Sequence, residues 1–106
     1  MEIKEKSIVA VDLDGTLCEG ECFTEEDCLK TKPKIEMINK VNELNRKKDC
    51  FIIIYTSRKE FLRNATTFWL KWTEVRYQAL VMEKLWADVY IDDKNVLIKD
   101  LMKDRR

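Results

Sequence analysis

Aspartates in two closely spaced pairs are the residues of this chain best suited to chemistry. Asp12 and Asp14 alternate with apolar residues in VAVDLDGT, and Asp92 and Asp93 follow the apolar segment ADVYI. Side chains two residues apart on a strand point to the same side, so Asp12 and Asp14 would repel each other. A divalent cation would relieve this repulsion, and carboxylate oxygens suit Mg²⁺, which commonly shares its remaining positions with a phosphate. The two pairs therefore predict a magnesium site.

Polar residues also follow the two other apolar segments of the chain. Thr56 and Ser57 come directly after CFIIIY, and Lys84 lies just beyond YQALVM. Hydroxyl and ammonium groups suit the oxygens of a phosphoryl group. One aspartate of the first pair could then attack phosphorus to form an aspartyl-phosphate, while the other transfers protons to the leaving oxygen and from water.

Four apolar, β-rich segments predict the strands that would position these residues. We expect strands at residues 7–13, 50–55, 77–82 and 87–91. Apolar residues at helical spacing predict helices at residues 33–47, 58–72 and 94–103, and leave residues 15–32 as a loop. Strands that alternate with helices indicate an α/β fold with a parallel sheet of about four strands. Such sheets bind ligands beyond the carboxyl ends of their strands, where all of the polar residues named above stand.

Three segments, DLDGT, FIIIYTSR and EKLWADVYIDDK, together resemble the motifs of the haloacid dehalogenase (HAD) superfamily. The match spans roughly residues 7–95, and the last two segments look most like small members near bacterial polysaccharide and capsule biosynthesis phosphatases. The resemblance implies a Mg²⁺-dependent phosphohydrolase on a minimal Rossmann-like core. The whole chain, residues 1–106, would be one HAD-like domain with a flap at about residues 15–32 and no cap domain.

The resemblance also implies a role for each carboxylate of the two pairs. Asp12 would be the nucleophile and a metal ligand. Asp14 would be the general acid and base, with its backbone carbonyl on the metal. Asp92 would bind Mg²⁺ directly, and Asp93 would bind through water or hold the other ligands in place.

The residues expected to bind phosphate come from the second and third motifs. Carried over from the family, Thr56 would bind the phosphoryl oxygens and Lys84 would pair with the nucleophile and the phosphate. Ser57 is a further phosphate-binding candidate, with a helix cap as its alternative role. Arg58 either reaches the substrate phosphate or lies on the surface of the following helix.

These motifs favour a phosphatase that hydrolyses phosphomonoesters, with a phosphorylated sugar or related metabolite ahead of a nucleotide as its substrate. A phosphoacceptor or phosphate-binding signalling module and a catalytically degenerate HAD scaffold stay open as alternatives. Basic and acidic residues balance at 20 each, so no overall positive charge attracts nucleic acid. The absence of histidine excludes a Ser-His-Asp triad.

Composition also bears on compartment and partners. The apolar runs are too short to cross a bilayer, and the N-terminal segment lacks the apolar stretch of a signal peptide. We therefore expect a cytoplasmic protein with free thiols and no membrane partner. The spacings of Cys18, Cys22 and Cys28 lack the close pairs of structural zinc sites, which disfavours zinc. The apolar residues of segment 58–72 exceed what one helix face usually buries, which leaves a homo-oligomer open.

Overall fold

Alternating strands and helices make up the part of the protein that the computed structural model describes, residues 2–84. The elements are β1 (Ile8–Asp12), α1 (Glu25–Lys30), α2 (Ile35–Lys48), β2 (Phe51–Tyr55), the 3₁₀ helix η1 (Glu60–Leu62), α3 (Arg63–Trp72) and β3 (Ala79–Val81). None of these helices is long and apolar enough to cross a membrane.

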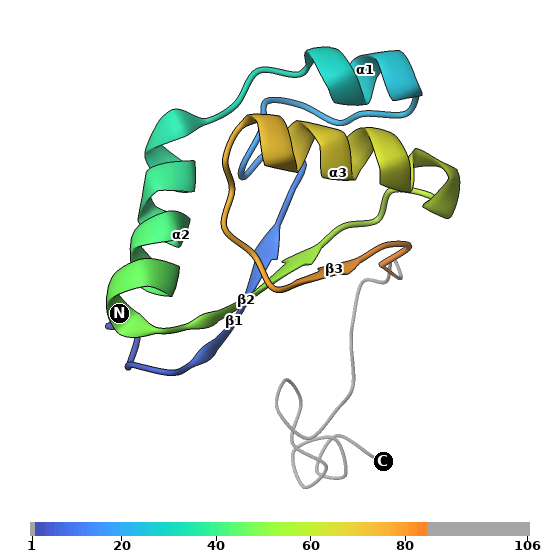
Figure 1. The fold of residues 1–106 in the computed structure, drawn as a ribbon. Helices are drawn as coiled ribbons and strands as arrows, with labels where there is room; N and C mark the ends of the chain where they lie inside the picture. Colours follow the sequence, from blue (N-terminus) through green and yellow to red (C-terminus); the bar gives the residue numbers. More distant parts are fainter. Residues whose placement is uncertain (1, 85–106) are drawn as a thin grey trace, which may run out of the picture.

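The three strands form a parallel sheet in the order β1-β2-β3, with β2 in the centre (Figure 1). The register pairs Asp12 with Tyr55 and Tyr55 with Val81. The last residues of all three strands therefore stand in one row across the sheet. The segments that follow them leave the sheet at one edge, which is the edge where parallel α/β sheets bind ligands.

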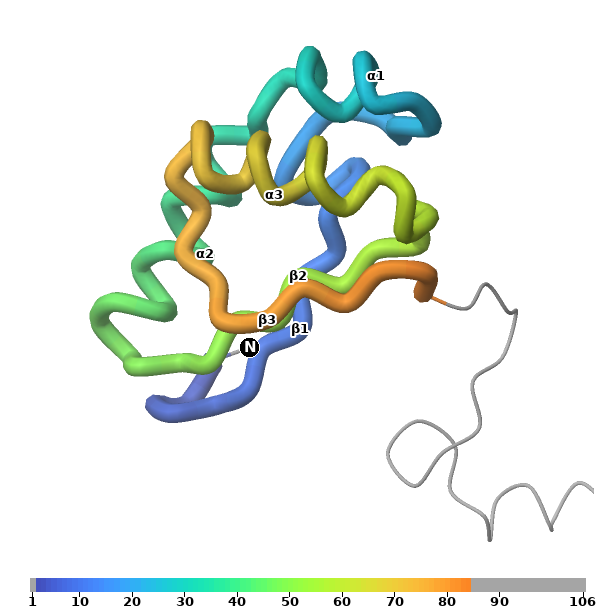
Figure 2. The backbone as a smooth tube through the Cα atoms, turned by 45° about the vertical axis from the view of Figure 1, so that its right-hand side comes forward, coloured from blue at the N-terminus to red at the C-terminus, as the bar shows by residue number. Residues whose placement is uncertain are grey.

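Helix α3 lies between the sheet and α1 (Figures 1 and 2). Its Trp69 is 1% exposed, and the indole Nε1 donates a hydrogen bond to the Thr31 carbonyl at 2.9 Å, just after α1. Ile52 and Ile54 of β2 are fully buried in the same core cluster. Burial of these large apolar side chains stabilises the stacking of the helices on the sheet.

The predictions of an α/β fold and of its first three strands are confirmed. Each observed strand lies inside its predicted range, and α2 begins two residues after the predicted start and ends one residue after the predicted end. The strand predicted at residues 87–91 and the helix predicted at 94–103 lie outside the described residues.

The segment 15–32 is not a loop throughout, because it contains α1. Thr24 caps this helix, since its Oγ1 accepts a hydrogen bond from the backbone N–H of Asp27 at 3.1 Å. Glu25, Glu26 and Asp27 place negative charge in the first turn, where it interacts favourably with the helix dipole. The flap therefore carries a short capped helix.

The predicted apolar face of segment 58–72 divides into buried and exposed residues. Leu62, Ala65 and Trp69 are buried. Phe68 and Trp72 are 61% and 71% exposed. Periodicity identified the helix, which begins later than predicted as η1 followed by α3. A homo-oligomer through the exposed aromatic residues stays a prediction.

Candidate active site

A tight turn after β1 orients the first aspartate pair. Leu13 is fully buried, and its carbonyl accepts hydrogen bonds from the backbone N–H groups of Thr16, Leu17 and Cys18 at 3.2, 2.9 and 3.3 Å. Gly15 takes a φ of +82°, a conformation that side chains with a Cβ rarely adopt. The turn buries the residue between the two aspartates and leaves both carboxylates at the edge of the sheet.

Backbone hydrogen bonds join the segments that follow β2 and β3. The Thr56 N–H donates to the Val81 carbonyl at 2.9 Å, and the Lys84 N–H donates to the Thr56 carbonyl at 2.8 Å. The Lys84 ammonium lies 5.0 Å from the centre of the Tyr55 ring, within range of a cation–π contact. These bonds extend the pairing of β2 with β3 and carry Lys84 to the same edge as the aspartates.

A cavity of about 660 Å³ opens at this edge. Asp12, Asp14, Ser57 and Lys84 all line it. The structure thus brings together four of the predicted site residues, which come from three separate segments of the chain. Asp92 and Asp93, the second predicted pair, lie outside the described residues.

Thr56 is not among the residues that line this cavity. It is 1% exposed, and its Oγ1 accepts a hydrogen bond from the backbone N–H of Arg58 at 3.2 Å. The residue of this pair that lines the cavity is Ser57. Contact between Thr56 and a phosphoryl group therefore stays a prediction.

Arg58 holds the Asp14 carboxylate. Its Nη2 lies 2.6 Å from Oδ1 of Asp14, and its Nε donates to Oδ1 and Oδ2 at 3.2 and 3.1 Å. The remaining nitrogen, Nη1, donates to the Thr66 hydroxyl at 2.9 Å. Burial is the largest influence on the pKa of Arg58 and lowers it, but the hydrogen bond and charge of Asp14 raise the pKa above its ordinary value.

The surface position considered for Arg58 from the sequence is wrong, because this residue is 4% exposed. All three guanidinium nitrogens have partners, on Asp14 and Thr66, so none of them is left without a hydrogen bond. Arg58 is thus a positioning residue for Asp14. The sequence pointed to Arg58 as the last residue of the FIIIYTSR segment but gave no sign of its contact with Asp14.

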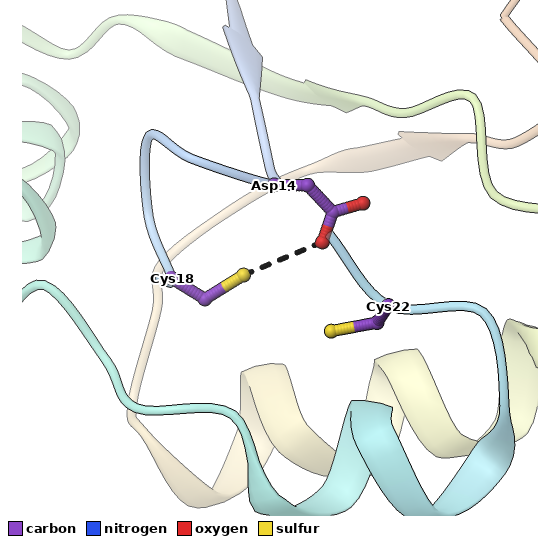
Figure 3. A group of neighbouring side chains, drawn as sticks. All are labelled: Asp14, Cys18 and Cys22. Atoms are coloured by element: carbon purple, nitrogen blue, oxygen red, sulfur yellow. Dashed lines mark hydrogen bonds between the residues drawn. The ribbon is translucent and has the colours of Figure 1, made fainter. Parts of the chain in front are cut away.

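Two cysteines of the flap complete the surroundings of Asp14 (Figure 3). The Cys18 thiol donates to Oδ1 of Asp14 at 3.4 Å, and the ligand atoms of Asp14, Cys18 and Cys22 lie within 4.8 Å of one another. Burial raises the pKa of Cys18 to about 12 and also raises the pKa of Cys22. A zinc ion here would have to displace Arg58 from Asp14 and to deprotonate both thiols, so the geometry favours two protonated thiols. All four cysteines are free.

The described part of the site fits a hard divalent cation at Asp12. The Asp12 side chain is exposed at the cavity, and within residues 2–84 its one hydrogen bond is accepted by Oδ1 from the backbone N–H of Leu13 at 3.0 Å. The Asp14 carboxylate is already held by Arg58. The exposed Asp12 carboxylate and the occupied Asp14 carboxylate agree with the ligands implied by the HAD resemblance. In that set Asp12 offers its carboxylate to the metal and Asp14 offers its backbone carbonyl.

The fold is shared with several solved structures. A crystal structure of a structural-genomics target from Vibrio cholerae is 22% identical, with a TM-score of 0.65 over 92% of this chain and 94% of that chain. A chain of the Pnkp1/Rnl/Hen1 complex is 18% identical, with a TM-score of 0.63 over 97% of this chain and 36% of that chain. A chain of the Pnkp1/Rnl/Hen1 RNA repair complex is also 18% identical, with a TM-score of 0.65 over 84% of this chain and 29% of that chain.

At these identities the structural matches show a common fold and no more. The protein spans about a third of the chains that it matches in the two Pnkp1/Rnl/Hen1 structures. No protein-family model matches the chain, and no curated protein matches it.

Proposed function

We propose that this protein is a Mg²⁺-dependent phosphatase that hydrolyses phosphomonoesters through an aspartyl-phosphate. The observation that carries the proposal is the convergence of Asp12, Asp14, Ser57 and Lys84 on one cavity at the carboxyl edge of the parallel sheet. The resemblance of three segments to HAD motifs supports the same chemistry. A phosphorylated metabolite, such as a sugar phosphate, is the substrate class that the sequence favours.

Asp12 is the proposed nucleophile. The hydrogen bond from the Leu13 N–H to Oδ1 fixes the carboxylate and leaves Oδ2 to attack phosphorus. A new bond forms between this oxygen and phosphorus as the bond between phosphorus and the ester oxygen breaks. Water then attacks the phosphorus of the aspartyl-phosphate, which releases inorganic phosphate and restores the carboxylate.

Asp14 is the proposed proton carrier for both steps. Its Oδ1 accepts hydrogen bonds from Arg58 and Cys18, whereas among the described residues its Oδ2 accepts one bond, from Arg58 Nε at 3.1 Å. Oδ2 is therefore the oxygen that would give a proton to the leaving group and later take one from water. Arg58 keeps this carboxylate in place while the proton moves.

Positive charge is needed because the phosphoryl group and the aspartates all carry negative charge. When bound, Mg²⁺ would neutralise part of that charge, with Asp12, Asp14, Asp92 and Asp93 as its proposed ligands. Lys84 and Ser57 line the same cavity, and their ammonium and hydroxyl groups would bind phosphoryl oxygens. Thr56, which precedes Ser57 in the chain, is a further candidate for this role.

Phosphate release from a panel of sugar phosphates, nucleotides and an aryl phosphate would test the proposal. We expect turnover that stops with EDTA, returns with Mg²⁺ and is lost in Asp12→Asn. The matched control is Asp49→Asn, because Asp49 is exposed and has a φ of +54°, which asparagine tolerates. Equal activity in Asp12→Asn and the parent protein would rule out Asp12 as the nucleophile.

The same experiment separates the two alternatives from the phosphatase. A signalling module would accumulate phosphate on Asp12 with little release, which acid quenching and mass spectrometry of the protein would detect. A degenerate scaffold would show neither phosphoprotein nor turnover. Either result would replace the proposed function.

A further inference from the structure

Two exposed phenylalanines line the cavity that holds the proposed nucleophile. Phe23 and Phe61 are 70% and 66% exposed, and both belong to the wall that also contains Asp12 and Asp14. Phe23 precedes α1 in the flap, whereas Phe61 is in η1 after β2. Isolated exposed aromatic residues are common on protein surfaces. Phe23 and Phe61 come from separate segments and line the same cavity as the carboxylates, which indicates a surface for binding substrate. We call these two residues the aromatic wall.

The backbone around each phenylalanine is anchored. The Phe23 N–H donates to Oδ2 of Asp27 at 3.4 Å. On either side of Phe61, the Glu60 N–H donates to Oε2 of Glu83 at 2.9 Å and the Leu62 N–H donates to the Lys59 carbonyl at 2.9 Å. The backbone of Phe61 is therefore held on both sides, whereas Phe23 has one long hydrogen bond. A backbone that is already held lowers the entropy cost of binding a ligand.

We propose that Phe23 and Phe61 bind a planar aromatic leaving group, such as a nucleobase attached through its sugar, while the phosphate lies at Asp12. This inference rests on the proposed phosphatase activity and specifies its substrate class. An aromatic face stacks favourably on phenylalanine rings. The apolar face of such a group also suits the buried residues Leu62 and Cys22, which line the same cavity.

A sugar without an aromatic group fits this part of the cavity less well. Each sugar hydroxyl that leaves water needs a hydrogen-bond partner, and Phe23, Phe61 and Leu62 offer none through their side chains. The face of an aromatic ring needs no such partner when it lies against these apolar side chains. The wall therefore reverses the order of substrates expected from the sequence and places nucleotides ahead of sugar phosphates.

The decisive comparison is adenosine 5′-monophosphate against ribose 5-phosphate. Their ester oxygens are chemically alike, so the presence of the base is the main difference. We expect kcat/KM to be at least about tenfold higher for the nucleotide, in line with the usual effect of one stacked base. Phe23→Ala and Phe61→Ala should each remove most of this preference by lowering kcat/KM for the nucleotide.

Phe68→Ala is the matched control, because Phe68 is 61% exposed and does not line this cavity. It should keep the preference for the nucleotide. Equal kcat/KM values for the two esters in the parent protein would overturn the aromatic wall but leave the phosphatase standing. A preference that survives both Phe23→Ala and Phe61→Ala would overturn it as well.

Binding separates failure of this inference from failure of the proposed function. If neither ester is hydrolysed, calorimetry with both compounds on the parent protein still tests the wall. Tighter binding of the nucleotide, lost in Phe61→Ala, would support the wall without the phosphatase, whereas equal binding would overturn it. A 5′-phosphorylated oligonucleotide then identifies the source of the base. Faster turnover of the oligonucleotide than of the nucleotide indicates that the substrate is a nucleic-acid end, and slower turnover indicates a free nucleotide. Both results support the aromatic wall.

Discussion

Asp14 and Arg58 form a buried ion pair that joins the end of β1 to the end of β2. Their side chains are 13% and 1% exposed, and Nη2 of Arg58 lies 2.6 Å from Oδ1 of Asp14. The two residues are 44 positions apart in the chain, so their contact depends on the pairing of the two strands. A buried pair of this kind has a large cost when one partner is removed, because the other charge stays behind without compensation.

Arg58→Ala should therefore destabilise the protein by about 3–5 kcal/mol, the usual result when one partner of a buried ion pair is removed. Arg58→Lys should recover part of the loss, because lysine restores the charge but not the several hydrogen bonds of the guanidinium group. Urea unfolding followed by circular dichroism would measure both changes.

The control for this prediction is Arg63→Ala, which removes the exposed pair between Arg63 and Glu60. It should leave the midpoint of unfolding unchanged, because exposed ion pairs contribute little. The double variant Asp14→Asn, Arg58→Ala should be less unstable than the sum of the two single variants. Additive losses would mean that Asp14 and Arg58 do not stabilise each other.

Asp14→Asn should affect phosphate esters according to their leaving groups. A nitrophenyl ester needs no proton on its leaving oxygen, so attack by Asp12 should still proceed, whereas water attack should be slow without the base. We expect a rapid burst of nitrophenol close to the enzyme concentration, followed by slow turnover. An alkyl ester needs the acid at the first step, so it should show no burst and should lose about 10²- to 10⁴-fold in rate.

Stopped-flow absorbance would measure the burst, and circular dichroism would establish that Asp14→Asn remains folded despite its weakened pair with Arg58. An equal loss of rate for both esters, without a burst, would contradict the assignment of Asp14 as the proton carrier. It would leave Asp14 with a structural role through Arg58.

The sheet and its functional edge could be predicted from the sequence because they depend on local patterns. Continuous apolar segments indicate buried parallel strands, and the residues just after them must meet at one edge. By that reasoning we expected Asp12, Asp14, Thr56, Ser57 and Lys84 to lie close together, and all of these except Thr56 line one cavity. That expectation needed no knowledge of side-chain packing.

The contacts between side chains could not be predicted in the same way. The pair of Asp14 with Arg58 depends on how a buried guanidinium group crosses from one segment to another, which leaves no local pattern. Helical spacing likewise could not separate buried Trp69 from exposed Phe68, because both lie on apolar positions of α3. Phe23 stands outside any periodic segment, and only the fold brings it to the cavity.

Cys18 should make the stability of the fold decrease at alkaline pH. Burial raises its pKa from 9.0 to about 12, so between these pH values the unfolded chain has lost a proton that the folded protein retains. The folded state then binds more protons, and the free energy of unfolding falls as pH rises, by up to about 1.4 kcal/mol per pH unit. The contribution is fully present below about pH 9 and is lost as pH rises toward the folded pKa.

Thermal unfolding of the parent protein and of Cys18→Ser between about pH 8 and about pH 11 would measure this effect, because serine does not titrate there. Other groups titrate in both proteins, so their effects on Tm largely cancel when one curve of Tm against pH is subtracted from the other. The parent Tm should fall more steeply above about pH 9 than that of Cys18→Ser, since about 1 kcal/mol shifts Tm by about 4–8 °C in a domain of this size. Parallel curves would show that burial does not keep the Cys18 thiol protonated.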